Sequence, residues 1–290
     1  MLYLRSLLFI PGNQPKMLNK APNVFPDAFI PDLEDSVAWD NKDDARNIVH
    51  NHLDMLSQTS KLLIPRVNAL ETGILKEDLQ SVINQNVFAI AIGKIYSSKD
   101  VQEISNLISK AEKEKKIQEG SIKLILWMET AQAIINAYEI LTSNKRIVGS
   151  AFGAEDFTND MGIHRTENEN EIFFARNQLS VASRAANVIA LDTPFFAFKD
   201  PDDLKENSLF AKSIGFKGKF AIHPDQIDII NDCFSPSIQE IDHAKKVIKT
   251  FEEAKKQGRG STSLDGLVID VPVVKRAESL LNISKEMGII

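Results

Sequence analysis

The stretch Lys123–Gln132, KLILWMETAQ, decides the fold, because it shows a buried strand that runs into a polar group. The apolar run Leu124–Met128 is typical of a strand that is buried on both faces, as in a parallel sheet. Glu129 follows at the position where such a strand should end. A carboxylate is seldom buried without a partner, so this position calls for a cation or a donor nearby.

Similar short apolar runs recur along the chain, and amphipathic segments with helical periodicity separate them. The expected strands are Ser6–Ile10, Ala28–Pro31, Leu62–Val67, Phe88–Ile92, Leu124–Met128, Ile147–Phe152, Val188–Leu191 and Lys219–Ile222. The clearest helices between them are Asp40–Leu56, Ser98–Gln118, Ala131–Leu141, Glu169–Ala186 and Pro201–Ile214. Strands that alternate with helices in this way, over about 225 residues, predict an α/β fold of the closed (β/α)₈ TIM barrel type.

An open, doubly wound sheet is the alternative to a closed barrel. The first strand-to-helix turn reads PGNQPK rather than G-x-G-x-x-G, so the fingerprint of dinucleotide binding is absent.

The pattern changes after Pro224. A long helix is expected over residues 236–257, then the Gly- and Ser-rich loop QGRGSTSLDG, and a further helix from Pro272. We therefore expect residues 1–232 to form the barrel with the metal site and residues 233–290 to form a C-terminal helical extension. Its apolar stripes need a partner, either the barrel or a neighbouring subunit.

Composition excludes several classes of protein. Net charge is −6, and the 34 basic and 40 acidic residues are mixed along the chain, so no basic block indicates nucleic-acid binding. The apolar runs are far shorter than the roughly 20 residues that span a bilayer, and Arg5 interrupts the apolar N-terminus, unlike a signal peptide. A single cysteine, Cys233, fits a reducing compartment. We expect a cytoplasmic protein with neither a nucleic-acid nor a membrane partner.

Charged groups gather at the carboxyl ends of the expected strands, where (β/α)₈ barrels hold their active sites. Glu129 and Asp156 follow two consecutive strands, and two carboxylates held close need a cation or a proton between them. Mg²⁺ usually takes one or two protein carboxylates and keeps several waters, and no Cys/His cluster competes for zinc. The alternative is that Glu129 caps the next helix and Asp156 pairs with a basic side chain.

Other charged positions have two interpretations each. Glu34 and Asp35 either hydrogen-bond metal-bound waters or cap the following helix. Arg66 carries a planar fork that binds a carboxylate or an oxyanion, but an ion pair with Asp32 or Asp35 explains it equally well. His223 precedes a proline and is more typical of a structural or ligand-contacting group than of a general base.

Seven motifs, in order along the chain, resemble those of the citrate lyase β-subunit-like proteins. These form the acyl-CoA lyase branch of the HpcH/HpaI aldolase superfamily, which includes malyl-CoA and citramalyl-CoA lyases. The motifs are RSLLFIPGNQPKMLNKA, DAFIPDLEDSVAWDNKDDAR, IPRVNAL, WMETAQAIINAYEI, GSAFGAEDFTNDMGI, GFKGKFAIHPDQIDIINDCFSP and LDGLVIDVPVVKRAESLL. The resemblance implies a barrel with C-terminal helices, assembled as a homotrimer or hexamer, and Mg²⁺-dependent, reversible retro-Claisen cleavage of a 3-hydroxyacyl-CoA.

The resemblance also implies roles for single residues. Glu129 and Asp156 would be the Mg²⁺ ligands, and Glu129 would also contact the substrate. Arg66 would bind the substrate and its enolate, and Asp270 would move a proton in the site of a neighbouring subunit. The residues expected to contact the CoA thioester are Phe9, Lys20, Ile222 and His223, and those expected to support metal-bound waters are Glu34 and Asp35.

The chain departs from the family pattern at two positions near the expected site. Gln14 stands where Arg often faces the CoA phosphates, and Gly93 stands where Pro commonly precedes Lys94. Two other enzymes of the family remain open as alternatives: a citrate lyase β subunit that acts on a carrier-bound citryl thioester within a complex, and a malyl-CoA thioesterase. A non-catalytic CoA-binding homologue is the alternative from another class.

Overall fold

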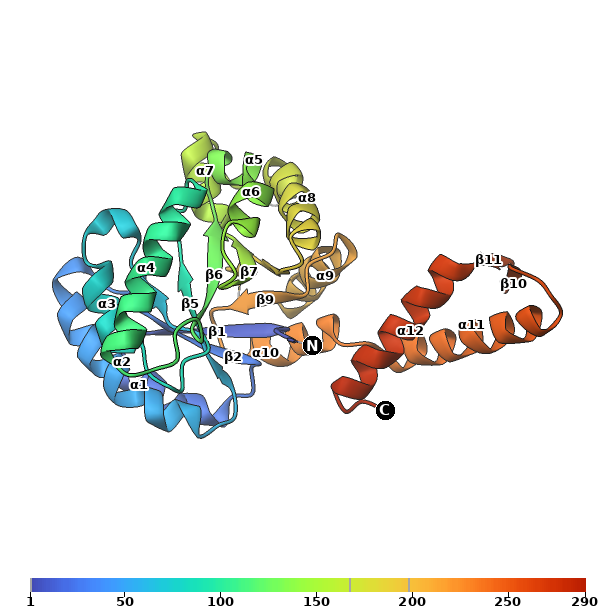
Figure 1. Ribbon diagram of the computed structural model, residues 1–290, viewed down its shortest axis with the longest axis horizontal. Helices are drawn as coiled ribbons and strands as arrows, with labels where there is room; N and C mark the ends of the chain where they lie inside the picture. Colours follow the sequence, from blue (N-terminus) through green and yellow to red (C-terminus); the bar gives the residue numbers. More distant parts are fainter. Residues whose placement is uncertain (1, 167, 198) are drawn as a thin grey trace. The chain divides into compact units, whose positions relative to one another are not determined.

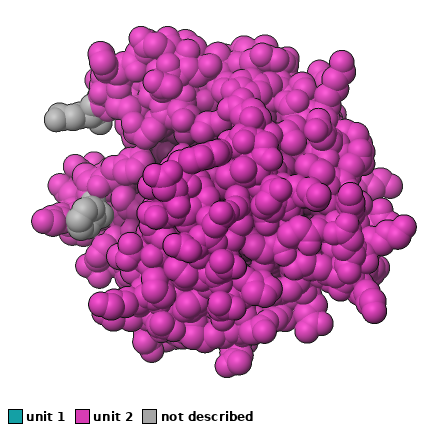
Figure 2. Space-filling model, turned by 90° about the vertical axis from the view of Figure 1, so that its left-hand side faces the viewer, with its two compact units in different colours: residues 1–2, 232–290 teal, residues 3–231 magenta. Residues whose placement is uncertain are grey.

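The structure is a computed structural model that describes residues 2–166, 168–197 and 199–290. The chain divides into two compact units, one of residues 3–231 and one of residues 232–290 together with Leu2. The division falls within helix α10 (Gln226–Phe234). Figure 2 shows one face of the larger unit.

The larger unit is a closed barrel of parallel strands with helices around it (Figure 1). β1 (Ser6–Pro11) pairs with both β2 (Ala28–Asp32) and β9 (Gly218–Ala221), and these two pairings close the sheet. The other strands are β3 (Leu62–Leu63), β4 (Arg66–Val67), β5 (Ala89–Ile92), β6 (Lys123–Met128), β7 (Ile147–Phe152) and β8 (Ile189–Asp192). The predicted TIM barrel is therefore confirmed, and each expected strand is present.

The third expected strand is divided into β3 and β4. Pro65 lies between the two pieces and has no N–H to donate to the ladder, so the pairing with β2 is interrupted there. Its carbonyl still accepts a hydrogen bond of 2.9 Å from the Ala91 N–H of β5. Beyond the break the strand pairs again, and Arg66 lies between Asp32 of β2 and Ala91 of β5.

The helices of the larger unit follow the strands in the order of a (β/α)₈ barrel. The expected helix over Ala131–Leu141 is two shorter helices, because Asn136 (φ −95°, ψ 13°) ends the first and begins the second. The helices before α10 are α1 (Pro15–Lys20), α2 (Lys42–Ser57), α3 (Leu75–Val82), α4 (Ser98–Glu114), α5 (Ala131–Ile135), α6 (Ala137–Thr142), α7 (Ala154–Met161), α8 (Asn170–Ala185) and α9 (Pro201–Ser213).

A buried ion pair lies near the amino ends of β6 and β7. Arg146 donates two hydrogen bonds to the Glu112 carboxylate, of 2.8 and 2.6 Å, and the N–H groups of Gly120 and Ile122 donate to the same carboxylate. Burial raises the pKa of Glu112, but these bonds outweigh it and hold the pKa below its usual value. In this buried pair the acidic and the basic side chain are therefore matched in charge.

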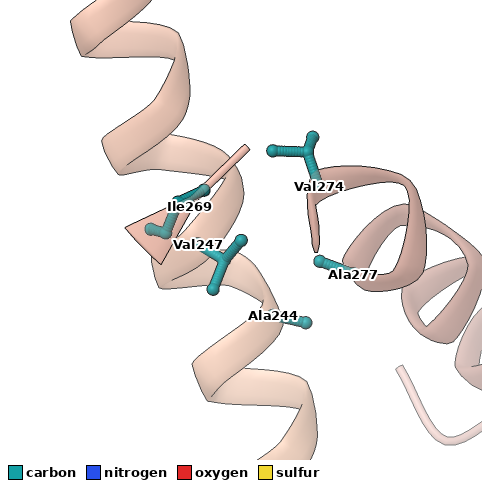
Figure 3. Close-up of a cluster of buried hydrophobic side chains, with 5 residues drawn as sticks. All are labelled: Ala244, Val247, Ile269, Val274 and Ala277. Atoms are coloured by element: carbon teal, nitrogen blue, oxygen red, sulfur yellow. The ribbon is translucent and has the colours of Figure 1, made fainter. Parts of the chain in front are cut away.

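The smaller unit contains α11 (Ile238–Lys256), a hairpin of β10 (Thr262–Leu264) and β11 (Leu267–Ile269), and α12 (Val271–Glu286). Its buried core consists of Ala244, Val247, Ile269, Val274 and Ala277 (Figure 3). Among the helices of the described residues, none is long and apolar enough to cross a membrane.

Candidate active site at the carboxyl ends of the strands

A cavity of about 390 Å³ opens at the carboxyl ends of the barrel strands. Its lining combines aromatic rings, carboxylates and one guanidinium. The lining residues are Phe9, Pro11, Asp32, Asp35, Ser36, Arg66, Trp127, Glu129, Gly153, Ala154, Glu155, Asp156, Thr193, Pro194, Phe196 and Ile222. This is where a (β/α)₈ barrel builds its active site.

Glu129 reaches this cavity from the end of β6 and is only 4% exposed. Its Oε1 accepts a hydrogen bond of 2.6 Å from the Lys94 N–H. Lys94 has a φ of +54°, an unusual value for a residue other than glycine, and this backbone turn presents its N–H to the carboxylate. The N-cap of α5 is Thr130, whose hydroxyl accepts from the Ala133 N–H. The interpretation of Glu129 as a helix cap is therefore wrong.

Two glycines make room for the Glu129 carboxylate. A Cβ at Gly93 would lie 2.4 Å from Oε1, and a Cβ at Gly153 would lie 2.5 Å from Oε2. Neither position can carry a side chain without displacing Glu129. Gly93, the departure from the family pattern, thus has a structural reason within the site itself.

Arg66 is held at the cavity by carboxylates. Its Nε and Nη2 donate to the two oxygens of Asp32 at 2.7 Å each, and its Nη1 donates to Asp35 at 2.9 Å and lies 3.1 Å from Glu34. Its guanidinium carbon lies 4.6 Å from the centre of the Phe9 ring, close enough for a cation–π contact. The ion-pair interpretation of Arg66 is thus realised, and Arg66 also faces the cavity.

The loop that carries Glu34 and Asp35 is held by hydrogen bonds to its backbone carbonyls. The buried Lys42 Nζ donates to the carbonyls of Leu33 and Glu34 at 2.6 and 2.7 Å, and Asn68 Nδ2 donates to the Leu33 carbonyl at 3.0 Å. Glu34 and Asp35 therefore pair with Arg66 in a fixed loop and do not cap α2, which begins at Lys42.

Negative charge exceeds positive charge around the cavity. Apart from Glu155, which pairs with Arg165, the acidic groups at or beside the cavity are Asp32, Glu34, Asp35, Glu129 and Asp156, and the basic groups are Arg66 and Lys94. We call these five carboxylates the acidic cluster.

The pKa values of the acidic cluster reflect this excess. Burial, followed by the charges of Glu34 and Asp156, raises the pKa of Glu129 to about 8. Burial and the neighbouring acids raise the pKa of Glu34 to about 7, although Arg66 opposes them. Burial and the charge of Asp35 also raise the pKa of Asp156. The acidic cluster therefore favours uptake of a proton or of a cation.

The donor set fits a hard divalent cation. Glu129 directly follows β6, and Asp156 lies in the first turn of α7, just after β7. Both offer carboxylate oxygens to a cavity that has room for water. Within the described part of the chain, no group of three or more His, Cys, Asp or Glu side chains is arranged around one metal position. This pattern suits Mg²⁺, which keeps several waters, and not the closed all-protein cage of a structural zinc site.

The remaining predicted residues divide into two groups. Phe9 and Ile222 line the cavity. Lys20 and His223 lie outside the lining. Lys20 is the exposed last residue of α1, and the partly exposed His223 ring accepts a hydrogen bond from the Asp225 N–H. Asp270 belongs to the smaller unit, where its Oδ1 accepts from the Val273 N–H as the N-cap of α12.

The sequence analysis did not identify Trp127 as an aromatic residue of the cavity lining. Trp127 contacts Phe9 and Phe220, with ring centres 5.8 and 4.5 Å away. The signal was available, because Trp127 lies two residues before Glu129 and so points to the same face of β6. Phe196, in the loop that follows β8, was also missed, because an irregular loop gives no periodicity.

The chain is similar to known proteins over most of its length. The model of the family described as HpcH/HpaI aldolase/citrate lyase matches residues 5–224. The citrate lyase subunit beta of Leuconostoc mesenteroides subsp. cremoris is 35% identical over 280 residues, which cover 97% of this chain and 93% of that protein. A (3S)-malyl-CoA thioesterase of Cereibacter sphaeroides is 33% identical over 266 residues, which cover 92% of this chain and 89% of that protein.

A solved structure extends the comparison. The crystal structure of CitE from Mycobacterium tuberculosis, in complex with magnesium, acetoacetate and coenzyme A, matches with a TM-score of 0.81 at 25% identity. The match covers 98% of each chain.

Proposed function

The chain belongs to the HpcH/HpaI aldolase/citrate lyase family and is a carbon–carbon lyase, and from that premise we propose that it is a magnesium-dependent acyl-CoA lyase. It would cleave a 3-hydroxyacyl-CoA of the citramalyl, malyl or citryl type to acetyl-CoA and a 2-oxo acid, reversibly. The observation that carries this proposal is that Glu129, Asp156 and Arg66 line one cavity.

Glu129 and Asp156 would hold Mg²⁺, with Glu34 and Asp35 orienting waters around it. When bound, the ion would act as a Lewis acid toward oxygen atoms of the substrate. The magnesium of the CitE complex, a protein 25% identical to this chain, supports this assignment.

Arg66 would stabilise the negative charge that develops on the thioester oxygen. In the cleavage, the bond between the hydroxyl-bearing carbon and the carbon next to the thioester breaks, and its electron pair forms the enolate of the thioester. Arg66 is already oriented by Asp32, so no reorganisation is needed when this charge appears.

Asp270 would move the proton. The substrate hydroxyl must lose a proton as it becomes the carbonyl of the 2-oxo acid, and the enolate carbon must gain one. We place Asp270 in the site of a neighbouring subunit, within a homotrimer or hexamer. A mixture of two inactive variants, Asp270→Asn and Glu129→Gln, would then recover activity, because some sites combine two intact residues.

The thioester would lie along the side of the cavity that Phe9 and Ile222 form. Lys20 and His223 would contact more distant parts of the CoA, since both lie outside the lining.

The relatives favour two second candidates. Similarity to the citrate lyase subunit beta supports action on a carrier-bound citryl thioester within a complex, and similarity to the (3S)-malyl-CoA thioesterase supports hydrolysis of the thioester. A single methyl group in a pocket changes discrimination by only about 1–3 kcal/mol, so substrate choice needs direct measurement.

The test is an assay of malyl-, citramalyl-, β-methylmalyl- and citryl-CoA, with Mg²⁺ and with EDTA. We expect an acyl-CoA and a 2-oxo acid to appear together, and only with Mg²⁺. Free CoA without an acyl-CoA product would indicate the thioesterase, and turnover only on a co-purified acyl carrier would indicate the complex subunit. Cleavage that persists in EDTA would contradict the role of the metal.

A further inference from the structure

We propose that Gln226 is a positioning residue that fixes the wall of the cavity against which the thioester binds. The inference rests on the proposed function, and it adds a residue to which no role has been given. Gln226 lies in the FAIHPDQ segment, directly after the loop that follows β9.

The side chain of Gln226 is buried, and both its amide oxygen and its amide nitrogen form hydrogen bonds. The residue is 1% exposed, and its Oε1 accepts hydrogen bonds from the Ile222 and His223 N–H groups at 2.8 and 3.2 Å. Its Nε2 donates to the Phe195 carbonyl at 2.8 Å. The amide has only one sensible orientation, because two donors face its oxygen and a carbonyl faces its nitrogen.

These bonds join two loops that the sheet leaves separate. The pairing of β8 with β9 ends at Asp192 and Lys219, before either loop begins. Beyond that pair, the amide of Gln226 bridges the loop after β8 to the loop after β9.

Both bridged loops supply the lining of the cavity. Ile222 comes from the loop after β9, and Pro194 and Phe196 flank the bonded Phe195 in the loop after β8. The amide therefore sets the distance between the two sides of this wall, while its own atoms stay buried behind it.

The position of Gln226 predicts which kinetic constant depends on it. Its hydrogen bonds go to Ile222, His223 and Phe195, and it lies outside the lining that contains Glu129, Asp156 and Arg66. Loss of the bridge should weaken binding of the thioester in the ground state and the transition state alike. Such a loss raises KM and leaves kcat unchanged.

The experiment compares Gln226→Met, which removes all three hydrogen bonds, with Gln226→Glu, which keeps an acceptor for the two N–H groups but loses the amide donor. Gln102→Met is the matched control, because Gln102 is exposed on α4 and its Nε2 donates to the side chain of Asn106 in the same helix. KM, kcat and the Mg²⁺ concentration for half-maximal activity are measured for each, with acetyl-CoA affinity by calorimetry.

We expect Gln226→Met to raise KM and to weaken acetyl-CoA binding by about tenfold, because the cavity wall is then no longer fixed before the thioester binds. Its kcat and Mg²⁺ requirement should stay within about twofold, and Gln226→Glu should fall between it and the wild type. If Gln226→Met does not fold, a KM raised in Gln226→Glu, with kcat retained, supports the same conclusion.

The inference would be overturned if both variants kept the KM and the acetyl-CoA affinity of the wild type. It would also be overturned if the variants lost kcat and the response to Mg²⁺ at the same time as their KM rose. The outcome is separable from that of the proposed function. A wild-type chain that cleaves no thioester would refute the proposed function, whereas weaker acetyl-CoA binding by the Gln226 variants would still support the bridge. A wild-type chain that binds no acetyl-CoA would refute the bridge as well.

Discussion

Arg66 and Asp32 are register partners on neighbouring strands, and two parallel hydrogen bonds of 2.7 Å join them. Burial alone would raise the pKa of Asp32, but the charge and hydrogen bonds of Arg66 outweigh it and lower the pKa. Asp32 is therefore an anion that orients the guanidinium, and the plane of the guanidinium is fixed before any substrate arrives.

This relationship predicts the effect of Asp32→Asn. The variant keeps the size of the side chain but loses the charge and one acceptor, so Arg66 can rotate away from the thioester oxygen. We expect kcat/KM to fall about 10–100-fold, as for other supporting residues of catalytic groups. The control is Asp43→Asn, whose carboxylate is 90% exposed and pairs with Arg46, outside the lining of the cavity. Equal effects of the two variants, measured by steady-state kinetics, would refute the orienting role.

The metal ligands predict a loss of binding without a loss of fold. Glu129→Gln and Asp156→Asn should abolish Mg²⁺ binding in calorimetry and abolish turnover. Thermal unfolding of the metal-free variants should occur no lower than in the wild type, because each substitution removes repulsion within the acidic cluster. Glu155→Gln is the matched control, since Glu155 neighbours Asp156 but is 56% exposed and pairs with Arg165. Normal turnover by either ligand variant would show that the assignment is wrong.

Gly93 predicts a metal defect from the smallest possible substitution. In Gly93→Ala the new methyl group would lie 2.4 Å from Glu129 Oε1, so the carboxylate must move. We expect Mg²⁺ affinity to fall about 10–100-fold with little change in the unfolding temperature. Gly260→Ala, where an added Cβ meets nothing within 4 Å, provides the control. Unchanged Mg²⁺ affinity in Gly93→Ala would mean that Glu129 binds the metal from another position.

The raised pKa of Glu129 predicts how stability depends on pH. The usual pKa of the group is 4.5 and the folded metal-free value is about 8, so the folded state binds the proton more tightly than the unfolded state. The stabilisation is complete below the usual pKa and is lost as pH rises through about 8. Chemical unfolding of the metal-free chain should show this decline, and the Glu129→Gln variant should lack much of it. Superimposable pH profiles for the two proteins would contradict the raised pKa.

Metal affinity should change with pH in the opposite sense. Mg²⁺ must displace the proton of Glu129, so its affinity should rise with pH up to about 8 and then level off. Calorimetric titrations at several pH values, with Mg²⁺ in each, measure this directly.

The sequence predicted the barrel well, because apolar runs and helical periodicity are local signals. The places where prediction was incomplete have local causes too. Pro65 removes one N–H and divides a strand, and Asn136 divides a helix. Each effect depends on a single residue within an otherwise regular pattern.

The site was less predictable than the fold. Glu129, Asp156 and Arg66 stood out as charges at strand ends, and the structure does bring them to one cavity. An ion pair of Arg66 with Asp32 or Asp35 was predicted, but the sequence did not show that both would bind the guanidinium together with Glu34. Strand register places Asp32 beside Arg66, and the loop anchored by Lys42 places Glu34 and Asp35 there. The roles of Gly93 and Gly153 were equally hidden, because they depend on space around a side chain distant in sequence.

The acidic cluster is unmatched in charge, unlike the buried Glu112–Arg146 pair at the amino end of the barrel, and this difference has a consequence for protein engineering. Glu112 and Arg146 neutralise each other at the amino end, whereas the carboxyl end carries more acid than base. Selection for heat resistance in the absence of metal would therefore favour neutral substitutions within the acidic cluster. Such variants would unfold at a higher temperature but would be inactive. A screen for thermostable forms of this enzyme therefore needs Mg²⁺ and an activity readout from its first round.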